Sequence, residues 1–226
     1  MIKLIIFDWD DVFSQGSTEG YYACYHHALL DVGIQLDPAE EDKRIKLQWG
    51  KGHREEIIEL LREHPELVDQ ACETYEKHFF GNTFVDALHV TPGSQDLVRR
   101  LAKQYTLAIA SGAHPVILKE RVFPKFQMPN VFSQIITAYD LDDPEKSKPH
   151  PYIANTIMET QGTKPAETIM VGDAKNDVLM ARAAGIEPVV VLTGHLNRQE
   201  AEELGVSYIL DDVTQLETAL TKLSNG

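Results

Sequence analysis

The chain has 226 residues, of which 43% are apolar and 25% charged, a composition typical of a folded globular protein. Its formal net charge of −14 disfavours binding to nucleic-acid backbones and to anionic membrane surfaces, which attract basic proteins. The two cysteines lack metal-ligand spacing, no apolar run reaches membrane-spanning length, and the N-terminal apolar run is too short for a signal sequence. We therefore expect a soluble, cytoplasmic protein with reduced thiols that binds neither nucleic acid nor membrane.

Six short apolar runs predict strands, and several of them end abruptly in polar residues. The first run does not alternate apolar with polar residues, which is typical of a strand buried on both faces of a parallel sheet. In chain order, the predicted strands are 3–7, 106–110, 135–137, 168–171, 188–192 and 208–210.

Helical patterns at 92–104, 114–122, 149–161 and 173–184 separate the later strands. This alternation predicts an α/β fold with a doubly wound parallel sheet. Such sheets bind their ligands outside the carboxyl ends of the strands, where polar residues stand in this sequence.

The segment 15–88 has no strand-like run of comparable quality and instead predicts helices at 17–32, 38–48, 53–63 and 66–80. An insertion of this length is too long for a simple crossover between two strands. We therefore predict a catalytic core of residues 1–14 and 89–226, with an inserted α-helical cap domain at 15–88.

Asp8 and Asp10 directly follow the first predicted strand and can share one side of the backbone. Their charges repel unless a cation lies between them or one carboxyl is protonated. Carboxylate oxygens suit Mg²⁺, and one carboxylate can attack phosphorus while the other serves as general acid and base. For this pair alone, the alternative is an acidic turn after a strand.

Three further groups stand at strand ends or helix starts. Asp173 ends a strand and Asp177 lies one turn into the next helix, so both carboxylates can lie together. The alternative is helix N-capping by Asp173 with a solvent-facing Asp177. The Ser111 hydroxyl and the Gly112 backbone can hold a phosphoryl oxygen, or can form a plain helix cap. Lys148 can reach such an oxygen as a point charge, or can be merely solvated.

The order of these groups along the chain is more informative than any one of them. Together they supply a metal site, a nucleophile, an acid/base, an oxygen clamp and a cation. Phosphoryl transfer depends mostly on positioning and electrostatics of this type. The sequence therefore favours a phosphoryl-transfer enzyme.

At this point the chain resembles the haloacid dehalogenase superfamily, specifically its phosphoglycolate-phosphatase-like branch with a helical cap after the first strand. The resemblance covers essentially the whole chain, including a similar tail at 192–195 and 201–211. The matching motifs are Phe7-Asp8-Trp9-Asp10-Asp11-Val12, Ser111, Lys148, and Gly172-Asp173 with Asp177.

The resemblance implies a Rossmann-like core and a magnesium-dependent phosphatase that acts through an aspartyl-phosphate. It implies that Asp8 is the nucleophile and a metal ligand, that Asp10 is the acid/base and a metal ligand through its carbonyl, and that Asp173 completes the ligands. The phosphoryl group would be held by Ser111, Gly112 and Lys148, with Asp177 as a supporting residue. The substrate class is a small phosphorylated metabolite, either phosphoglycolate or a sugar phosphate.

Two departures from the family pattern leave alternatives open. Asp11 stands where the family usually has glycine, so a catalytically weak binding module on the same fold is one alternative. Lys146 competes with Lys148, although the Lys-Pro-His-Pro context favours Lys148. A β-phosphoglucomutase-like phosphomutase is the other alternative, but such enzymes usually carry Glu-Asp where this chain has Gly172-Asp173.

The cationic, glycine-rich stretch at 50–54 lies in the predicted cap domain and is our candidate for selecting the substrate. Its charged residues Lys51, His53 and Arg54 could meet the far polar end of a substrate. The alternative is a solvated loop in which Arg54 pairs with nearby acidic residues.

Overall fold

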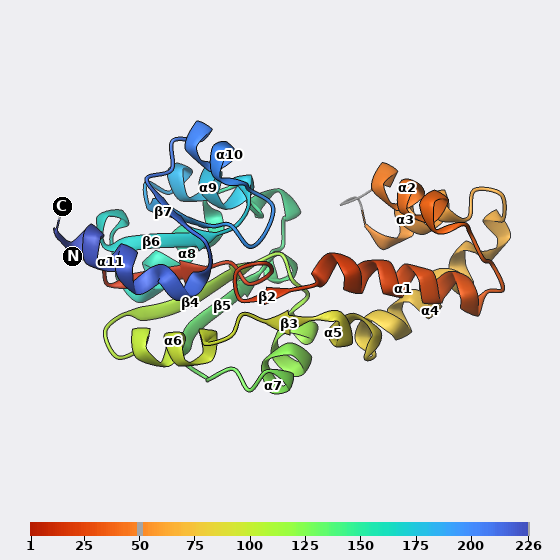
Figure 1. Ribbon diagram of the computed structural model, residues 1–226, viewed down its shortest axis with the longest axis horizontal. Coiled ribbons are helices and arrows are strands. Elements are labelled where there is room, and N and C mark those ends of the chain that lie inside the picture. Colours follow the sequence, from red (N-terminus) through yellow and green to blue (C-terminus); the bar gives the residue numbers. More distant parts are fainter. Residues whose placement is uncertain (49–51, 226) are drawn as a thin grey trace. The chain divides into compact units, whose positions relative to one another are not determined.

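The computed structural model describes residues 1–48 and 52–225 (Figure 1). The chain divides into two compact units: Met1–Gln15 with Val90–Gly226 (the core unit) and Gly16–His89 (the helical unit). At the two points where the chain passes from one unit to the other, β2 (Ser14–Gln15) pairs with β3 (His89–Val90). Within the described ranges, no helix is long and apolar enough to cross a membrane.

Six parallel strands form the sheet of the core unit in the order β5-β4-β1-β6-β7-β8. The chain adds β4 and β5 on one side of β1 and then returns to add the others on the opposite side. This reversal confirms the predicted doubly wound α/β fold and makes β1 the switch point of the sheet. The strands are β1 (Leu4–Phe7), β4 (Thr106–Ser111), β5 (Phe132–Thr137), β6 (Thr168–Gly172), β7 (Glu187–Val191) and β8 (Tyr208–Leu210).

Helices cover both faces of this sheet. Apolar residues of α8 and α9 pack on one face against β1, β4 and β6. On the other face, Phe123 of α7 contacts Phe132 of β5, and Figure 1 shows α6 on that side as well. The helices of the core unit are α6 (Ser94–Leu101), α7 (Phe123–Lys125), α8 (Tyr152–Gln161), α9 (Lys175–Ala183), α10 (Arg198–Glu203) and α11 (Leu216–Asn225).

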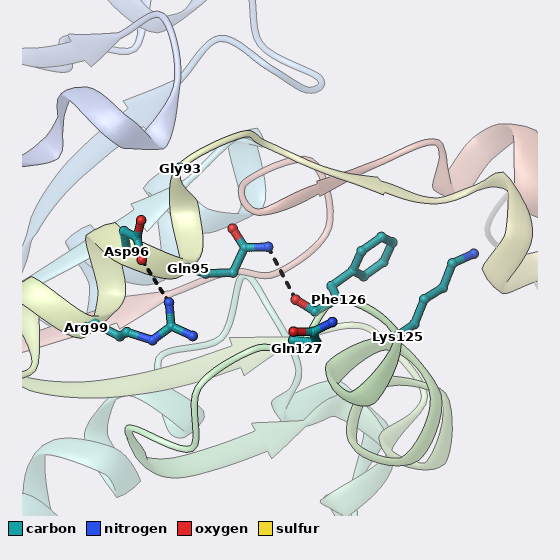
Figure 2. A pocket seen from close by; sticks show the side chains of 7 residues that line it. All are labelled: Gly93, Gln95, Asp96, Arg99, Lys125, Phe126 and Gln127. Carbon is teal, nitrogen blue, oxygen red and sulfur yellow. Dashed lines mark hydrogen bonds and ion pairs between the residues drawn. The ribbon is translucent and has the colours of Figure 1, made fainter.

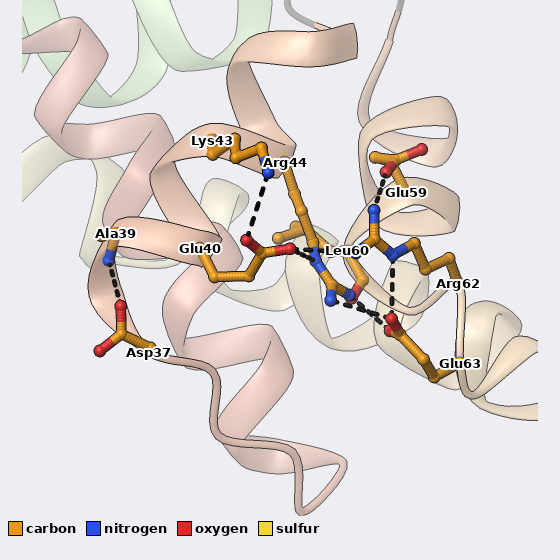
Figure 3. A network of polar contacts seen from close by, with 9 residues as sticks. All are labelled: Asp37, Ala39, Glu40, Lys43, Arg44, Glu59, Leu60, Arg62 and Glu63. Carbon is orange, nitrogen blue, oxygen red and sulfur yellow. Dashed lines mark hydrogen bonds and ion pairs between the residues drawn. The ribbon is translucent and has the colours of Figure 1, made fainter.

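The helical unit contains α1 (Ser17–Asp31), α2 (Pro38–Gln48), α3 (His53–Leu60), α4 (Val68–Phe80) and α5 (Thr83–Ala87). A buried arginine joins two of these helices (Figure 3). Arg44 of α2 contacts Glu40 at 2.8 Å and Glu63 at 2.6 Å, and it donates to the Leu60 carbonyl at 2.9 Å. The guanidinium is buried, so it depends on these partners, and its bond to the Leu60 carbonyl fixes α2 against the end of α3.

The ends of the elements differ from the predicted ones in two informative places. The helix predicted at 53–63 ends at Leu60, because Pro65 lacks the N–H that would continue it and disfavours helical backbone at His64, whose φ is −135°. The helix predicted at 114–122 is present, but Ile117–Val122 is π-helical and leads directly into α7. Helices α5, α10 and α11 were not predicted.

Candidate active site

The site is built at the carboxyl ends of three adjacent strands. Register places Phe7 of β1 beside Ile109 of β4 and Val171 of β6, so the residues that follow these positions emerge at one edge. Asp8 is tied to this edge because its N–H donates to the Val171 carbonyl at 2.8 Å. The predicted groups that follow β1, β4 and β6 therefore lie at the same edge of the sheet.

The turn after β1 points alternate side chains in different directions. Phe7 and Trp9 both pack on Phe13, with ring centroids 5.0 and 5.3 Å away. Asp8 and Asp10 alternate with these aromatic residues, as the first motif predicts for a pair that shares one side. The burial of the aromatic rings thus anchors the segment that carries the two carboxylates.

Asp11 holds a left-handed backbone conformation with φ 55°, and its N–H donates to the Ser14 carbonyl at 2.6 Å. Glycine adopts this conformation without steric cost, and aspartate is among the few other residues that tolerate it. The glycine-to-aspartate departure seen in the sequence is therefore compatible with the turn.

Lys148 joins the first and last motifs. Its Nζ lies 2.8 Å from Asp8 Oδ1 and 2.8 Å from Asp177 Oδ1, and its side chain is 12% exposed. Burial alone would lower the pKa of Lys148, but Asp177 and Asp8 raise it above its usual value, so the ammonium stays charged. Lys146, the competing candidate, instead lies 4.8 Å from the centroid of the Tyr152 ring.

Asp177 also caps the N-terminus of α9. Its Oδ2 accepts from the N–H groups of Asp173 at 3.3 Å and Ala174 at 3.1 Å, while its Oδ1 meets Lys148. An ideal Cβ on Gly172 would lie 2.4 Å from the Asp177 Cβ, so glycine is required for this packing. The capping carboxylate is therefore that of the buried Asp177, not that of Asp173, and Asp177 faces the cluster and not the solvent.

A loop after β7 reaches the same cluster. The Thr193 hydroxyl donates to the Asp11 carbonyl, and the His195 N–H donates to Asp173 Oδ2 at 3.0 Å. At Gly194, an ideal Cβ would lie 2.0 Å from Asp173 Oδ2 and 2.6 Å from the Asp11 Cβ. The loop can approach both aspartates this closely only because residue 194 has no side chain.

Burial and mutual repulsion disfavour the ionised forms of the carboxyl groups in the site. Burial raises the pKa of Asp8 to about 7, although Lys148 lowers it. Burial, followed by the charge of Asp8, raises the pKa of Asp10 to about 7. Burial, followed by the charge of Asp177, raises the pKa of Asp173 to about 7 as well. A cation would relieve this excess of negative charge.

The oxygen atoms are arranged to receive such a cation. One carboxylate oxygen from each of Asp8, Asp173 and Asp177 lies within 4.8 Å of the others. A second group with the same spacing is formed by Asp11, Asp173 and His195. Hard carboxylate oxygens are ligands that Mg²⁺ accepts, so the residues present fit a divalent cation.

Ser111 and Gly112 stand at the end of β4. The Ser111 hydroxyl is buried and accepts from the Ala113 N–H at 3.0 Å, a local turn that precedes the following helix. No atom lies within 4 Å of an ideal Cβ on Gly112, so the backbone there faces open space. This geometry leaves room for a ligand at the Gly112 backbone.

The substrate-selecting candidates of the helical unit have local partners. The His53 ring stacks on Tyr75 with centroids 5.0 Å apart, and the exposed Arg54 lies 2.5 Å from Asp69 Oδ1. The Arg54 contact is the pairing with an acidic residue that the alternative interpretation anticipates. Lys51 lies outside the described residues.

A separate cavity of about 430 Å³ lies in the core unit near the start of α6 (Figure 2). Arg99 faces Asp96 there at 2.8 Å, and Gln95 donates to the Phe126 carbonyl at 3.3 Å. None of the candidate site residues lines this cavity.

Sequence reasoning noted 192–195 only as part of a similar tail, and so it missed the contacts of Thr193, Gly194 and His195. The available signal was their position directly after a predicted strand of the same parallel sheet. Residues at that position emerge at the same edge as Asp8 and Asp173.

Comparison with known proteins places these features in a family. The haloacid dehalogenase-like hydrolase family matches residues 2–185. A phosphoglycolate phosphatase of Aliivibrio fischeri is 26% identical over 230 residues, covering 97% of both chains. The pyrophosphatase PpaX of Bacillus mycoides is 31% identical over 213 residues, covering 92% of this chain and 87% of the relative.

Solved structures agree on the fold. A haloacid dehalogenase-superfamily hydrolase of Geobacter sulfurreducens superposes with a TM-score of 0.76 at 21% identity, covering 97% of this chain and 96% of the other. The family match spans most of the sequence, including the turn after β1, Lys148 and the start of α9. The chain therefore belongs to the haloacid dehalogenase-like hydrolase family.

Proposed function

We propose that this protein is a magnesium-dependent phosphatase that hydrolyses a small phosphomonoester through an aspartyl-phosphate on Asp8. The observation that carries the proposal is the pair of 2.8 Å contacts from Lys148 to Asp8 and Asp177, beside the buried Asp173. The phosphatase and pyrophosphatase names of the relatives support the same reaction class.

In this proposal Asp8 attacks phosphorus in line, and the alcohol of the substrate leaves. Lys148 keeps Asp8 oriented and offsets the charge of the phosphoryl group, because it remains charged between two carboxylates. Ser111 and the Gly112 backbone hold phosphoryl oxygens at the end of β4. Mg²⁺, held by Asp8, Asp173 and the Asp10 carbonyl, would supply further charge neutralisation.

Asp10 is the proposed general acid and base. Its pKa of about 7 allows the carboxyl to carry a proton near neutral pH, which the leaving alcohol needs. After the alcohol leaves, the carboxylate can take a proton from the water that attacks the aspartyl-phosphate. Asp177 supports both steps by holding Lys148 and the N–H of Asp173.

The packing at Gly172 favours the phosphatase over a phosphomutase. The mutases that the chain resembles carry glutamate at this position, but an ideal Cβ there would lie 2.4 Å from Asp177. A glutamate would require Asp177 to move, and with it the contact to Lys148.

The test is the release of inorganic phosphate from a panel of small phosphomonoesters, with phosphoglycolate and inorganic pyrophosphate included. We expect release in Mg²⁺, none in chelator, and none from Asp8→Asn, which keeps the shape of the side chain but removes the nucleophile. Wild-type rates from Asp8→Asn would refute the assignment of Asp8. Isomerisation of a sugar phosphate without net release would favour the phosphomutase.

A further inference from the structure

The side chain of Ser14 is fully buried at the end of the turn that carries Asp8 and Asp10. Its hydroxyl oxygen has no hydrogen-bond partner with good geometry in the part of the chain that the structure describes. A buried hydroxyl without a partner costs free energy, because it has given up its bonds to water. The preceding side chains, Val12 and Phe13, are apolar and buried, so neither can satisfy it.

Asp10 is the polar group that lies beside this hydroxyl. The backbone forms a parallel β-bridge between Asp10 and Ser14, and the Asp11 N–H donates to the Ser14 carbonyl at 2.6 Å. Burial and the charge of Asp8 raise the pKa of Asp10, whereas a hydrogen bond from the Ser14 side chain lowers it. This bond is longer or less well aligned than an ideal one, as catalytic hydrogen bonds often are before a substrate binds.

The backbone on either side of Ser14 is held by one buried residue, Thr91. The Thr91 N–H donates to the Phe13 carbonyl at 2.9 Å. The Gln15 side-chain amide donates to the Thr91 hydroxyl at 2.8 Å. Both chain neighbours of Ser14 are therefore tied down, so its hydroxyl is presented from a fixed point.

The carboxyl group of Asp10 needs such a fixed partner. The torsion that turns an aspartate carboxyl has broad preferences, so the backbone alone does not decide which oxygen faces the substrate. We propose that Ser14 is a positioning residue, whose hydroxyl donates to one carboxyl oxygen of Asp10 and thereby turns the other toward the leaving alcohol. This role rests on the proposed function, in which Asp10 is the general acid and base.

Ser14 would serve both steps of the reaction. In the first, Asp8 bonds to phosphorus, the bond from phosphorus to the alcohol oxygen breaks, and the proton of Asp10 passes to that oxygen. In the second, a water oxygen bonds to phosphorus, the bond to Asp8 breaks, and the Asp10 carboxylate takes the proton of the water. The Ser14 hydroxyl keeps its own proton throughout and holds the same carboxyl oxygen.

The test compares two phosphomonoesters that differ in their need for a proton. The alkyl phosphate that the wild type hydrolyses fastest releases a strongly basic alkoxide unless it is protonated, whereas para-nitrophenyl phosphate releases a weakly basic phenolate. The ratio kcat/KM measures stabilisation of the transition state relative to free enzyme and substrate, so it reports the departure of the alcohol and not the later hydrolysis. Ser14→Ala should lower kcat/KM about tenfold or more for the alkyl ester, but less than about threefold for the nitrophenyl ester.

Three further variants separate positioning from packing. Ser14→Thr keeps the hydroxyl, so it should keep the wild-type preference between the two esters even where the added methyl lowers both rates. In an Asp10→Asn background, Ser14→Ala should cause no further loss, because the hydroxyl acts only through Asp10. Ser94→Ala is the matched control and should also keep the preference, because Ser94 is equally buried in the core unit and donates to the Thr91 carbonyl at 2.7 Å.

Wild-type kcat/KM values in Ser14→Ala, or an equal loss with both esters, would overturn the role of Ser14 and leave the phosphatase assignment intact. A loss that persists in the Asp10→Asn background would overturn it as well, because the hydroxyl would then act on another group. A wild type that releases no phosphate from any ester would instead refute the proposed function, and with it the step that Ser14 serves.

Discussion

Replacing Lys148 with methionine tests the electrostatic centre of the site. The substitution keeps an unbranched side chain of similar length and removes the ammonium that lies 2.8 Å from both Asp8 and Asp177. Both carboxylates would then be buried without their cation. Lys146→Met is the matched control, because that lysine lies over the face of the Tyr152 ring and away from the carboxylate cluster.

These distances set the expected loss of folding stability in Lys148→Met. Each contact at 2.8 Å corresponds to about 6 kcal/mol of attraction at an effective dielectric constant of about 20. Desolvation of the buried ammonium offsets much of this attraction, and breaking a buried pair typically costs about 3–5 kcal/mol. For Lys146→Met the loss is about 0.5–1 kcal/mol, the value of an exposed cation–π contact.

The loss of folding stability in Lys148→Met should depend on pH. At pH 8 Asp8 is largely ionised and the full cost applies, whereas at pH 5 its pKa of about 7 keeps it protonated in the folded state and the cost is smaller. The assay is urea unfolding of both variants in chelator at the two pH values. A Lys148→Met protein within about 0.5 kcal/mol of the wild type at pH 8, or no different from Lys146→Met, would refute the reasoning.

Two further outcomes follow from the same site. The folded-state pKa values of Asp8, Asp10 and Asp173 are about 7 against the usual 3.8, so in chelator these groups should make the protein less stable as pH rises from about 4 to about 7. Mg²⁺ should therefore raise the melting temperature more at pH 8 than at pH 5. An equal rise at both pH values would contradict these shifts. Gly194→Ala should lower the free energy of unfolding in urea by about 1–3 kcal/mol, because its Cβ would meet Asp173 Oδ2 at 2.0 Å. Gly112→Ala, with open space around its Cβ, should lower it by less than about 1 kcal/mol. Equal losses would show that the loop after β7 can move away from Asp173 without cost.

Local patterns in the sequence were sufficient to predict the strands of the core sheet. Unalternating apolar runs such as Leu4–Phe7 predicted strands buried on both faces, and the doubly wound order then follows from the strand–helix alternation. The same logic brings Asp8 and Asp173 to one edge, since parallel neighbours end together. The catalytic roles of these residues stay predictions that activity measurements must test.

Long-range contacts were beyond such patterns. Thr193 and Asp11 are 182 positions apart, and no local periodicity reveals that the loop after β7 meets the turn after β1. The Lys-Pro-His-Pro context favoured Lys148 over Lys146, but no local pattern showed that Lys148 lies between Asp8 and Asp177. Short elements such as α5 carry too few residues for a periodic signal.

The most direct test of the central claim is to trap the phosphoryl group on Asp8. Wild-type protein turning over its best phosphomonoester in Mg²⁺ would be quenched in acid, reduced with borohydride, digested and analysed by mass spectrometry. Borohydride reduces an acyl phosphate to the alcohol, so we predict conversion of Asp8 to homoserine, only when substrate is present. Turnover with Asp8 unmodified, or with the label on Asp10 or Asp173 instead, would contradict the account.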